Sequence, residues 1–380
     1  MKKLLVKNIG LLATPEGRSA HRGEEQGKIK FLKDAWVLIE DGTIASVGTG
    51  AVPAVEGAEV VDAEGHLVTP GLVDAHTHLI FGGWRQNELG LKLHGASYLD
   101  IQNAGGGIQS TTNATRQASE QELAAKASKA LEVIKDLNDH HRMDLVATFM
   151  GAHLVPAEYK SNREEYVRLV CEEMMPKVKE QGIAKFCDVF CEADTFTVEE
   201  SRQVLEAGLK YGLRPKIHAD EIEAIGGSQL AGEIGAISAE HLIVCPPEGI
   251  ESMAKGGVIA CLLPATSFNL GAVFAPARDM VAAGVPVAMA TDFNPGSCPC
   301  LNMQFVINLG CLKYKLTPEE VLTAVTLNGA AAIDLADKVG SVEEGKLGDL
   351  VIWDAPDLDY ICYRVGSNLA KTVIKRGEIV

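Results

Sequence analysis

The sequence predicts an α/β fold, a TIM-like (β/α) barrel with a small β-domain built from both ends of the chain. Three observations predict it. Strand signals fill the first 66 residues, short apolar runs alternate with amphipathic helical stretches from about Val68 onward, and strand signals return near the end. The middle of the chain is close to the ~250 residues typical of such a barrel. We therefore expect a β-domain of residues 1–66 and 345–380 and a barrel of residues 67–344.

The composition is that of a globular protein and excludes several classes of function. Of the 380 residues 47% are hydrophobic, and 35 Lys and Arg against 51 Asp and Glu give a formal net charge of −16. Such a charge repels nucleic-acid phosphates and anionic membrane surfaces. The nine cysteines are odd in number and lie mostly in apolar runs, as is typical of reduced thiols. We expect a cytoplasmic protein with a small-molecule substrate and neither a nucleic-acid nor a membrane partner.

The β-domain begins with a strand at residues 4–8. Strands at 35–40 and 44–47 follow, joined by Asp41-Gly42, a strong signal for a two-residue hairpin turn. The strands at 349–354 and 371–374 are expected to pair with them.

Seven apolar runs are expected to form the parallel strands of the barrel. Several helices between or after them begin at capping boxes, in which Ser or Thr precedes Glu by three residues. The strands are 68–79, 145–152, 184–191, 214–218, 237–243, 258–263 and 285–291, and the capping boxes are Ser119 with Glu122, Thr197 with Glu200 and Thr317 with Glu320.

Two histidines end the first of these strands, in Asp74-Ala75-His76-Thr77-His78. Residues i and i+2 of a strand point to the same side, so His76 and His78 can bind one metal ion together. Barrel enzymes keep their active sites at the carboxyl ends of the strands. The position of the pair therefore favours a metal site over a structural role.

Further polar residues stand at the ends of later strands: His218, His241 and Asp292. Three imidazoles and a carboxylate suit Zn²⁺ or Fe with room for water. Glu221 and His241 then remain as acid–base groups beside the metal. The expected ligands of one metal ion, Zn or Fe, are His76, His78, His218 and Asp292.

Blocks along nearly the whole chain carry a resemblance: Asp74-Ala75-His76-Thr77-His78, Gly95-Ala96-Ser97-Tyr98, Gly105-Gly106-Gly107-Ile108, Gly151-Ala152-His153, His218-Ala219-Asp220-Glu221 and Thr291-Asp292-Phe293-Asn294-Pro295-Gly296-Ser297. The sequence resembles the amidohydrolase superfamily and, more closely, its imidazolonepropionase family. The resemblance implies a barrel with a small β-sandwich from both chain ends, and a homodimer. It also implies hydrolysis of the ring amide of 4-imidazolone-5-propanoate to N-formimidoyl-L-glutamate in histidine degradation.

The same resemblance implies roles for individual residues. Glu221 and His241 would serve the attacking water, and Asp292 would pass a proton to the leaving nitrogen. A guanidinium such as that of Arg85 can bind the propionate carboxylate through paired hydrogen bonds. The residues that match substrate-binding or product-binding positions are Arg85, Tyr98, His153, Glu221, Asn294, Gly296 and Ser297.

The sequence departs from this family at one place. Family members have a further strand and helix before the strand that ends in Gly151-Ala152-His153, whereas residues 120–141 resemble one continuous helix. We expect one βα unit to be missing between Arg116 and Asp144, and with it a tyrosine that contacts the substrate. Two alternatives stay open. One is an aromatic-base deaminase, because His-x-x-Glu with a single metal also suits attack on an amidine carbon, and the other is a metal-binding homologue without activity.

Overall fold

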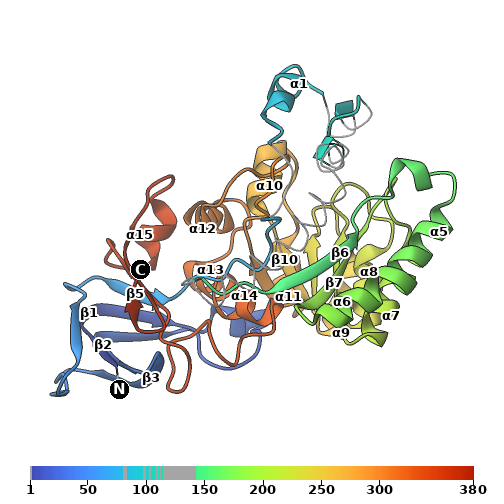
Figure 1. Cartoon of the computed structure of the whole chain (residues 1–380). Helices are drawn as coiled ribbons and strands as arrows, with labels where there is room; N and C mark the ends of the chain where they lie inside the picture. The colour runs from blue at the N-terminus through green and yellow to red at the C-terminus, as the bar shows by residue number, and fades with distance from the viewer. Residues whose placement is uncertain are drawn as a thin grey trace.

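A computed structural model of the chain describes residues 2–79, 84–96, 100–101, 104–107, 110–111, 113 and 143–380. These residues form a mixed α/β structure with two sheets. One sheet lies at the lower left of Figure 1, in the region where both labelled termini are found, and the other lies to the right among green and yellow helices.

The first sheet takes its strands from both ends of the chain. They are β1 (Lys3–Thr14), β2 (Lys30–Glu40), β3 (Thr43–Thr49), β4 (Glu59–Asp62), β5 (Leu67–Pro70), β12 (Leu350–Trp353), β13 (Ala370–Lys375) and β14 (Glu378–Ile379). The order is β14-β13-β12-β5-β1-β2-β3, with β4 also paired to β1. Because β12 lies antiparallel between β5 and β13, the end of the chain completes a sheet that the beginning starts.

The turn between β2 and β3 shows how the sequence determines this sheet locally. Asp41 and Gly42 have φ angles of 47° and 80°, as a type I′ hairpin turn requires. Glu40 pairs with Thr43 across the turn, which sets the register of the two strands. Inward-facing residues such as Val37 then join a separate apolar core belonging to this sheet.

The second sheet is parallel throughout. Its strands are β6 (Ala147–Ala152), β7 (Ala184–Cys191), β8 (Arg214–Ala219), β9 (Ser238–His241), β10 (Ile259–Leu262) and β11 (Val287–Met289). Their spatial order, β11-β10-β9-β8-β7-β6, follows the chain. Six of the predicted barrel strands thus occur in sequence order, and among the described residues β6 pairs with β7 alone.

The prediction of one strand over residues 68–79 is wrong, because the observed strand ends at Pro70. Its first residues form β5 in the sheet of the chain ends. Pro70 has no amide hydrogen to extend a ladder, and the Gly71 amide instead donates to the Asp349 carbonyl. Further on, Thr77 forms a single parallel bridge with Phe293. The segment with His76 and His78 is therefore an extended connection that runs beside the residues after β11.

Helices follow the strands along the chain. They are α1 (Leu89–Leu93), α5 (Arg163–Arg168), α6 (Met175–Gln181), α7 (Val198–Lys210), α8 (Gly227–Ile234), α9 (Pro247–Gly256), α10 (Pro264–Leu270), α11 (Ala277–Ala282), α12 (Met303–Leu312), α13 (Pro318–Ala324), α14 (Leu327–Ala332) and α15 (Leu358–Tyr363). Among them, α6, α7, α8, α11, α13 and α14 contact the parallel sheet. Short 3₁₀ turns lie at Gly23–Gly27, Gln86–Glu88 and Ala157–Tyr159, and a π-helix at Leu169–Met174 joins α5 to α6.

Two of the predicted capping boxes are confirmed at the helix starts. Thr197 begins α7 and Thr317 begins α13, each with both reciprocal hydrogen bonds formed. The box at Ser119 and the predicted helix at 120–141 lie outside the described residues. Within the described part of the chain, no helix combines the length and the apolar character needed to cross a bilayer.

Candidate functional site

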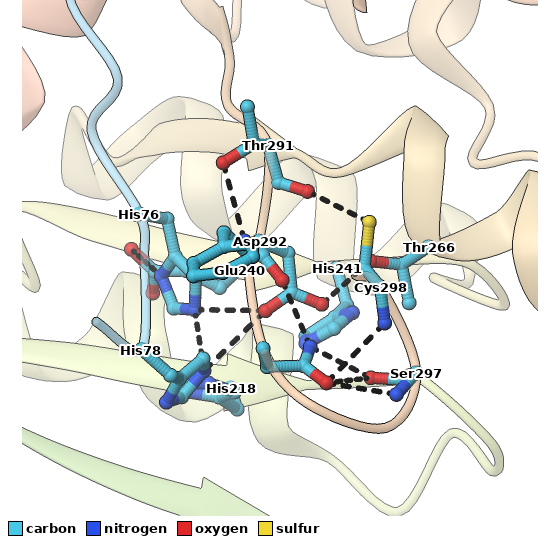
Figure 2. A network of polar contacts seen from close by, with 12 residues as sticks. His76, His78, His218, Glu240, His241, Thr266, Thr291, Asp292, Ser297 and Cys298 are labelled. Carbon is cyan, nitrogen blue, oxygen red and sulfur yellow. Dashed lines mark hydrogen bonds and ion pairs between the residues drawn. The ribbon is translucent and has the colours of Figure 1, made fainter. Parts of the chain in front are cut away.

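Five polar residues singled out by the sequence lie together at the carboxyl ends of the parallel strands: His76, His78, His218, His241 and Asp292 (Figure 2). His218 lies in β8, His241 ends β9, and Asp292 comes three residues after β11. Backbone hydrogen bonds align the segment of the histidine pair with the chain after β11. The Asp292 amide donates to the His76 carbonyl at 3.0 Å, and the His78 amide donates to the Phe293 carbonyl at 2.8 Å.

The side chains of His76, His78, His218 and Asp292 point toward a common centre. The Nε2 atoms of His76 and His78 lie 3.3 Å apart, and Oδ1 of Asp292 lies 3.7 Å from the first and 3.4 Å from the second. Potential ligand atoms of His76, His78 and His218 all lie within 4.8 Å of one another, as do those of His76, His241 and Asp292. The structure thus brings the predicted ligands together and places His241 at the same centre.

Two buried atoms of this cluster suit a bound cation. Within the described part of the chain, Nε2 of His218 and Oδ1 of Asp292 have no hydrogen-bond partner. Such atoms are rare because each unpaired buried polar group costs about 1–3 kcal/mol. A cation at the centre would satisfy both, and imidazole and carboxylate donors fit Zn²⁺ or Fe.

Burial and mutual charge favour the metal-binding protonation states of His76, His218 and Asp292. At His78, burial lowers the pKa, but the neighbouring Asp292 carboxylate outweighs burial and raises it. Burial, together with the charges of His218 and His78, lowers the pKa of His76 well below its ordinary value. Burial and the charges of His241 and His78 likewise lower the pKa of His218. Burial raises the pKa of Asp292, but its ion pair with His78 and the neighbouring histidine charges outweigh this and lower the pKa overall. Neutral imidazoles and an ionised carboxylate are the forms that ligate metals.

Three charged residues behind this cluster were not identified from the sequence. Asp188 Oδ1 lies 3.1 Å from His218 Nδ1, and Lys216 Nζ lies 3.0 Å from Glu240 Oε1. The same Glu240 oxygen lies 3.9 Å from His76 Nδ1. All three side chains are buried. Their signal in the sequence is a charged residue inside an otherwise apolar strand, as Asp188 is in β7.

Glu221 and His241 form a pair beside the cluster. Glu221 Oε1 lies 3.7 Å from His241 Nδ1, and both side chains are mostly buried. Burial raises the pKa of Glu221, and the charge of His241 partly offsets this effect. A carboxylate with a raised pKa is a stronger proton acceptor than an ordinary one. The pair is therefore suited to acid–base work.

The backbone is strained at these strand ends. Asp220, His241 and Asp292 have φ angles of 52°, 68° and 53°, in the left-handed region that residues with a side chain seldom adopt. Each such residue costs about 1–2 kcal/mol, which the surrounding fold must offset. Strain of this kind concentrates at functional sites.

Arg85 and the loop after Asp292 lie against each other. A Cβ on Gly296 would stand 2.1 Å from Cζ of Arg85, so this close approach requires glycine. The Arg85 guanidinium donates two hydrogen bonds of 3.0 Å to the buried Glu88 carboxylate. Within the loop, Oδ1 of Asn294 accepts hydrogen bonds from the amides of Gly296 and Ser297 at 2.9 and 2.8 Å. Asn294 therefore shapes this loop.

His153 stacks on a member of the cluster. Its ring lies 5.4 Å from that of His78 with an interplanar angle of 12°. Burial, with the charges of His78 and His218, lowers the pKa of His153 well below its ordinary value, so it approaches the cluster as a neutral ring. Tyr98, the other aromatic residue predicted at the site, lies outside the described residues.

Comparison with known proteins identifies the relatives of this chain. The amidohydrolase family matches residues 67–380. Imidazolonepropionase from Alkaliphilus metalliredigens is 47% identical, and the alignment covers 100% of this chain and 98% of that protein. Imidazolonepropionase from Geobacillus kaustophilus is 46% identical with the same coverage. The first alignment spans 414 positions, 34 more than the 380 residues of this chain.

Solved structures with the same fold are more distant in sequence. Atrazine chlorohydrolase from Arthrobacter aurescens, complexed with zinc, superposes with a TM-score of 0.69 at 18% identity, covering 99% of this chain and 94% of that one. An adenosine deaminase from Xanthomonas campestris with bound zinc gives 0.69 at 20% identity, covering 100% and 92%. Fold, family match and full-length similarity agree, and the chain belongs to the amidohydrolase family and, within it, to the imidazolonepropionases.

Proposed function

We propose that this protein hydrolyses the ring amide of 4-imidazolone-5-propanoate to N-formimidoyl-L-glutamate, a step of histidine degradation. One observation carries the proposal. A chain 47% identical to a named imidazolonepropionase over its full length gathers His76, His78, His218 and Asp292 at one centre, with Glu221 beside them. The deaminase and the inactive homologue remain as outcomes of the test described below.

One metal ion, Zn or Fe, would be held by His76, His78, His218 and Asp292. Nε2 of His218 and Oδ1 of Asp292, which have no hydrogen-bond partner among the described residues, support this assignment. When bound, such a metal polarises a carbonyl group and makes a water molecule a nucleophile at neutral pH. The zinc named with the two related structures favours Zn.

The chain's own residues move the protons. Glu221 takes a proton from the attacking water. His241, whose Nδ1 lies 3.7 Å from Glu221 Oε1, stabilises the negative charge of the Glu221 carboxylate before and after this transfer. Thr266 Oγ1 donates a 2.5 Å hydrogen bond to Oδ2 of Asp292, which holds that carboxylate in place. Asp292 takes the second proton of the added water and passes it to the ring nitrogen as the C–N bond breaks. The water oxygen is then part of the new carboxylate.

Substrate binding is assigned to Arg85, Tyr98, His153, Glu221, Asn294, Gly296 and Ser297. Arg85 would bind the propionate carboxylate, and its contact with Gly296 supports a place at the rim of the site. His153 would contact the ring of the substrate, since its own ring lies next to His78. Asn294 contributes by shaping the loop that carries Gly296 and Ser297.

We also propose the architecture around the site. Residues 67–344 form a (β/α) barrel, and residues 1–66 with 345–380 form a β-sandwich. One βα unit is absent between Arg116 and Asp144, as supported by the 34 additional positions in the alignment with the Alkaliphilus protein. The protein is a cytoplasmic homodimer that acts on a small molecule. The net charge of −16 argues against nucleic-acid and membrane partners.

The test is an assay of the purified protein for loss of imidazolonepropionate absorbance, with metal content measured on the same sample. We expect about one metal per chain, turnover that disappears on chelation, and recovery with Zn²⁺ or Fe. Ammonia release from an aromatic base without consumption of imidazolonepropionate would establish the deaminase instead. Stoichiometric metal with no hydrolysis of any cyclic amide would establish the inactive homologue.

A further inference from the structure

We propose that Glu192 is a positioning residue for Glu221: its buried carboxylate holds the loop that places Glu221 beside the metal ligands. The proposal rests on the proposed function, because it deepens the role given there to Glu221. Glu192 follows directly after β7, and its side chain is 1% exposed.

Each oxygen of the Glu192 carboxylate accepts two hydrogen bonds from backbone amides. Oε2 accepts from Glu221 at 2.9 Å and from Ile222 at 2.8 Å. Oε1 accepts from Glu223 at 2.9 Å and from Ala193 at 3.0 Å. One side chain thus binds three consecutive amides of the loop that follows β8, beginning with the amide of Glu221 itself.

These hydrogen bonds hold a loop that has few others among the described residues: the Asp220 carbonyl accepts from the Val244 amide and the Glu223 carbonyl from the Ile225 amide. The residues between β8 and α8 form no regular helix or strand. Within the described part of the chain, the amides of Glu221, Ile222 and Glu223 have no other acceptor. Hydrogen bonds from backbone amides to an ionised carboxylate are shorter and stronger than those between neutral groups. Glu192 therefore sets the distance between the Glu221 side chain and His241.

Glu192 is itself fixed by the end of β7. The Thr195 amide donates to the Glu192 carbonyl at 3.1 Å, and the Thr195 hydroxyl donates to the Phe190 carbonyl at 2.8 Å. The neighbouring strands are in register at this point, with Cys191 paired to Ala219. The Glu192 carboxylate therefore links the end of β7 to the loop that follows β8, and the position of this loop depends on the position of that strand end.

Glu192 acts through Glu221 and not on the substrate. A carboxylate offers about four lone-pair sites, and four amides occupy those of Glu192. It has no acceptor capacity left for a substrate proton. This separates its role from that of Glu221, whose carboxylate faces His241.

The first test is Glu192→Gln. Glutamine keeps the size but replaces one acceptor oxygen with an NH₂ donor, so two of the four amides lose their partner. A displacement of about 1 Å at a reacting group costs on the order of 100-fold in rate. We expect kcat to fall by about that factor, with metal content unchanged and KM altered by less than roughly threefold. An unchanged kcat would overturn the proposal.

The matched control is Glu200→Gln, eight residues further along. Its carboxylate also accepts a backbone amide, from Thr197 at 2.9 Å, but it is paired with Arg163 and lies outside the site. Turnover in this variant should equal that of the unmodified protein. Equal losses of kcat at positions 192 and 200 would mean a general effect on the fold and would overturn the positioning role.

A double-mutant cycle separates an effect of Glu192 through Glu221 from a general loss of structure. If Glu192 acts only through Glu221, adding E192Q to E221Q should leave the residual turnover unchanged within about twofold. If the fold-losses in turnover of E192Q and E221Q multiply in the double variant, the proposal is overturned, because Glu192 would then contribute independently of Glu221.

Amide hydrogen exchange tests the same inference without turnover. In E192Q, exchange should accelerate at residues 221–223, while E200Q leaves these amides as in the unmodified protein. If the unmodified protein fails to hydrolyse imidazolonepropionate, the proposed function fails, and this exchange pattern still decides whether Glu192 holds the loop. If E192Q does not fold, Glu192→Asp provides the comparison, because it keeps the charge but cannot reach every amide. Unchanged exchange at residues 221–223 in the variant that folds would overturn the proposal.

Discussion

Nδ1 of His218 lies 3.1 Å from Oδ1 of Asp188, while Nε2 of the same ring has no hydrogen-bond partner among the described residues. A carboxylate at one nitrogen of a ligating histidine fixes the tautomer and leaves the other nitrogen free to bind metal. Asp188, on the neighbouring strand β7, thus orients His218 for the ligand role proposed for it.

Replacing Asp188 with Asn should weaken metal binding. The loss of such a partner typically costs about 10–100-fold in metal affinity. Competition with a chelator of known affinity measures the change, and Asp194→Asn, an exposed aspartate in the loop after β7, is the control. An affinity for Zn²⁺ that is the same in D188N and D194N would contradict the assignment.

Glu221→Gln and Asp292→Asn should each abolish most of the turnover with the fold retained. Loss of a general acid or base typically lowers the rate by about 10²–10⁴-fold. E221Q should keep its metal, because Glu221 is not among the proposed ligands, whereas D292N should also bind metal more weakly. Glu223→Gln, an exposed neighbour, should leave kcat unchanged. Full activity in both E221Q and D292N would refute the proposed roles.

The Lys216–Glu240 ion pair should matter for stability because it is almost fully buried. Lys216→Met leaves the Glu240 charge without its partner, which typically costs about 3–5 kcal/mol. The exposed pair of Lys255 and Glu251 provides the contrast, and Lys255→Met should cost less than about 1 kcal/mol. Urea unfolding at pH 7 measures both. Similar free energies of unfolding for the two variants would show that burial of the pair has no such effect.

Glu200 should make stability depend on pH in the acid range. Burial raises its pKa, but hydrogen bonds from Arg163 and the Thr197 amide outweigh burial and lower the pKa below the ordinary 4.5. The unfolded chain then binds more protons, so this contribution is present above about pH 4.5 and is lost as pH falls through the lower folded-state value. E200Q should cost about 1 kcal/mol at pH 7 and clearly less near pH 3. A cost independent of pH would contradict this linkage.

Local patterns in the sequence predicted the elements that depend on local chemistry. Residues 184–191 were expected as a strand and form β7 with those bounds, and Asp41-Gly42 forms the expected hairpin turn. The run 68–79 was misjudged because its apolar pattern continues across Pro70, where the chain leaves one sheet and approaches the other. An apolar pattern indicates that residues are buried, but it does not indicate which of the two sheets buries them.

In the site, too, residues recognisable from local sequence were predicted, whereas residues whose role depends on a tertiary contact were not. His218 and Asp292 could be predicted because strand ends are recognisable from composition and turn signals. The roles of Asp188 and Glu192 depend on what lies opposite them on β8 and in its loop, which is a tertiary relationship. A single sequence shows that such residues are charged within apolar surroundings, but it does not show their partners.

Pro70 of β5 pairs with Leu350 of β12, although 280 residues separate them in the chain. During synthesis, β1 to β5 can pair among themselves, but the other edge of β5 must wait for β12 until almost the whole polypeptide has left the ribosome. Until then, the apolar face of β1 and β2 lacks the strands that complete its sheet, and exposed strand edges favour aggregation. A stop codon just before residue 350 would remove β12, β13 and β14 and leave β5, from which the chain runs on to His76 and His78, without its antiparallel partner. The segment with the proposed ligands His76 and His78 thus leaves from a strand whose second edge only the end of the chain completes.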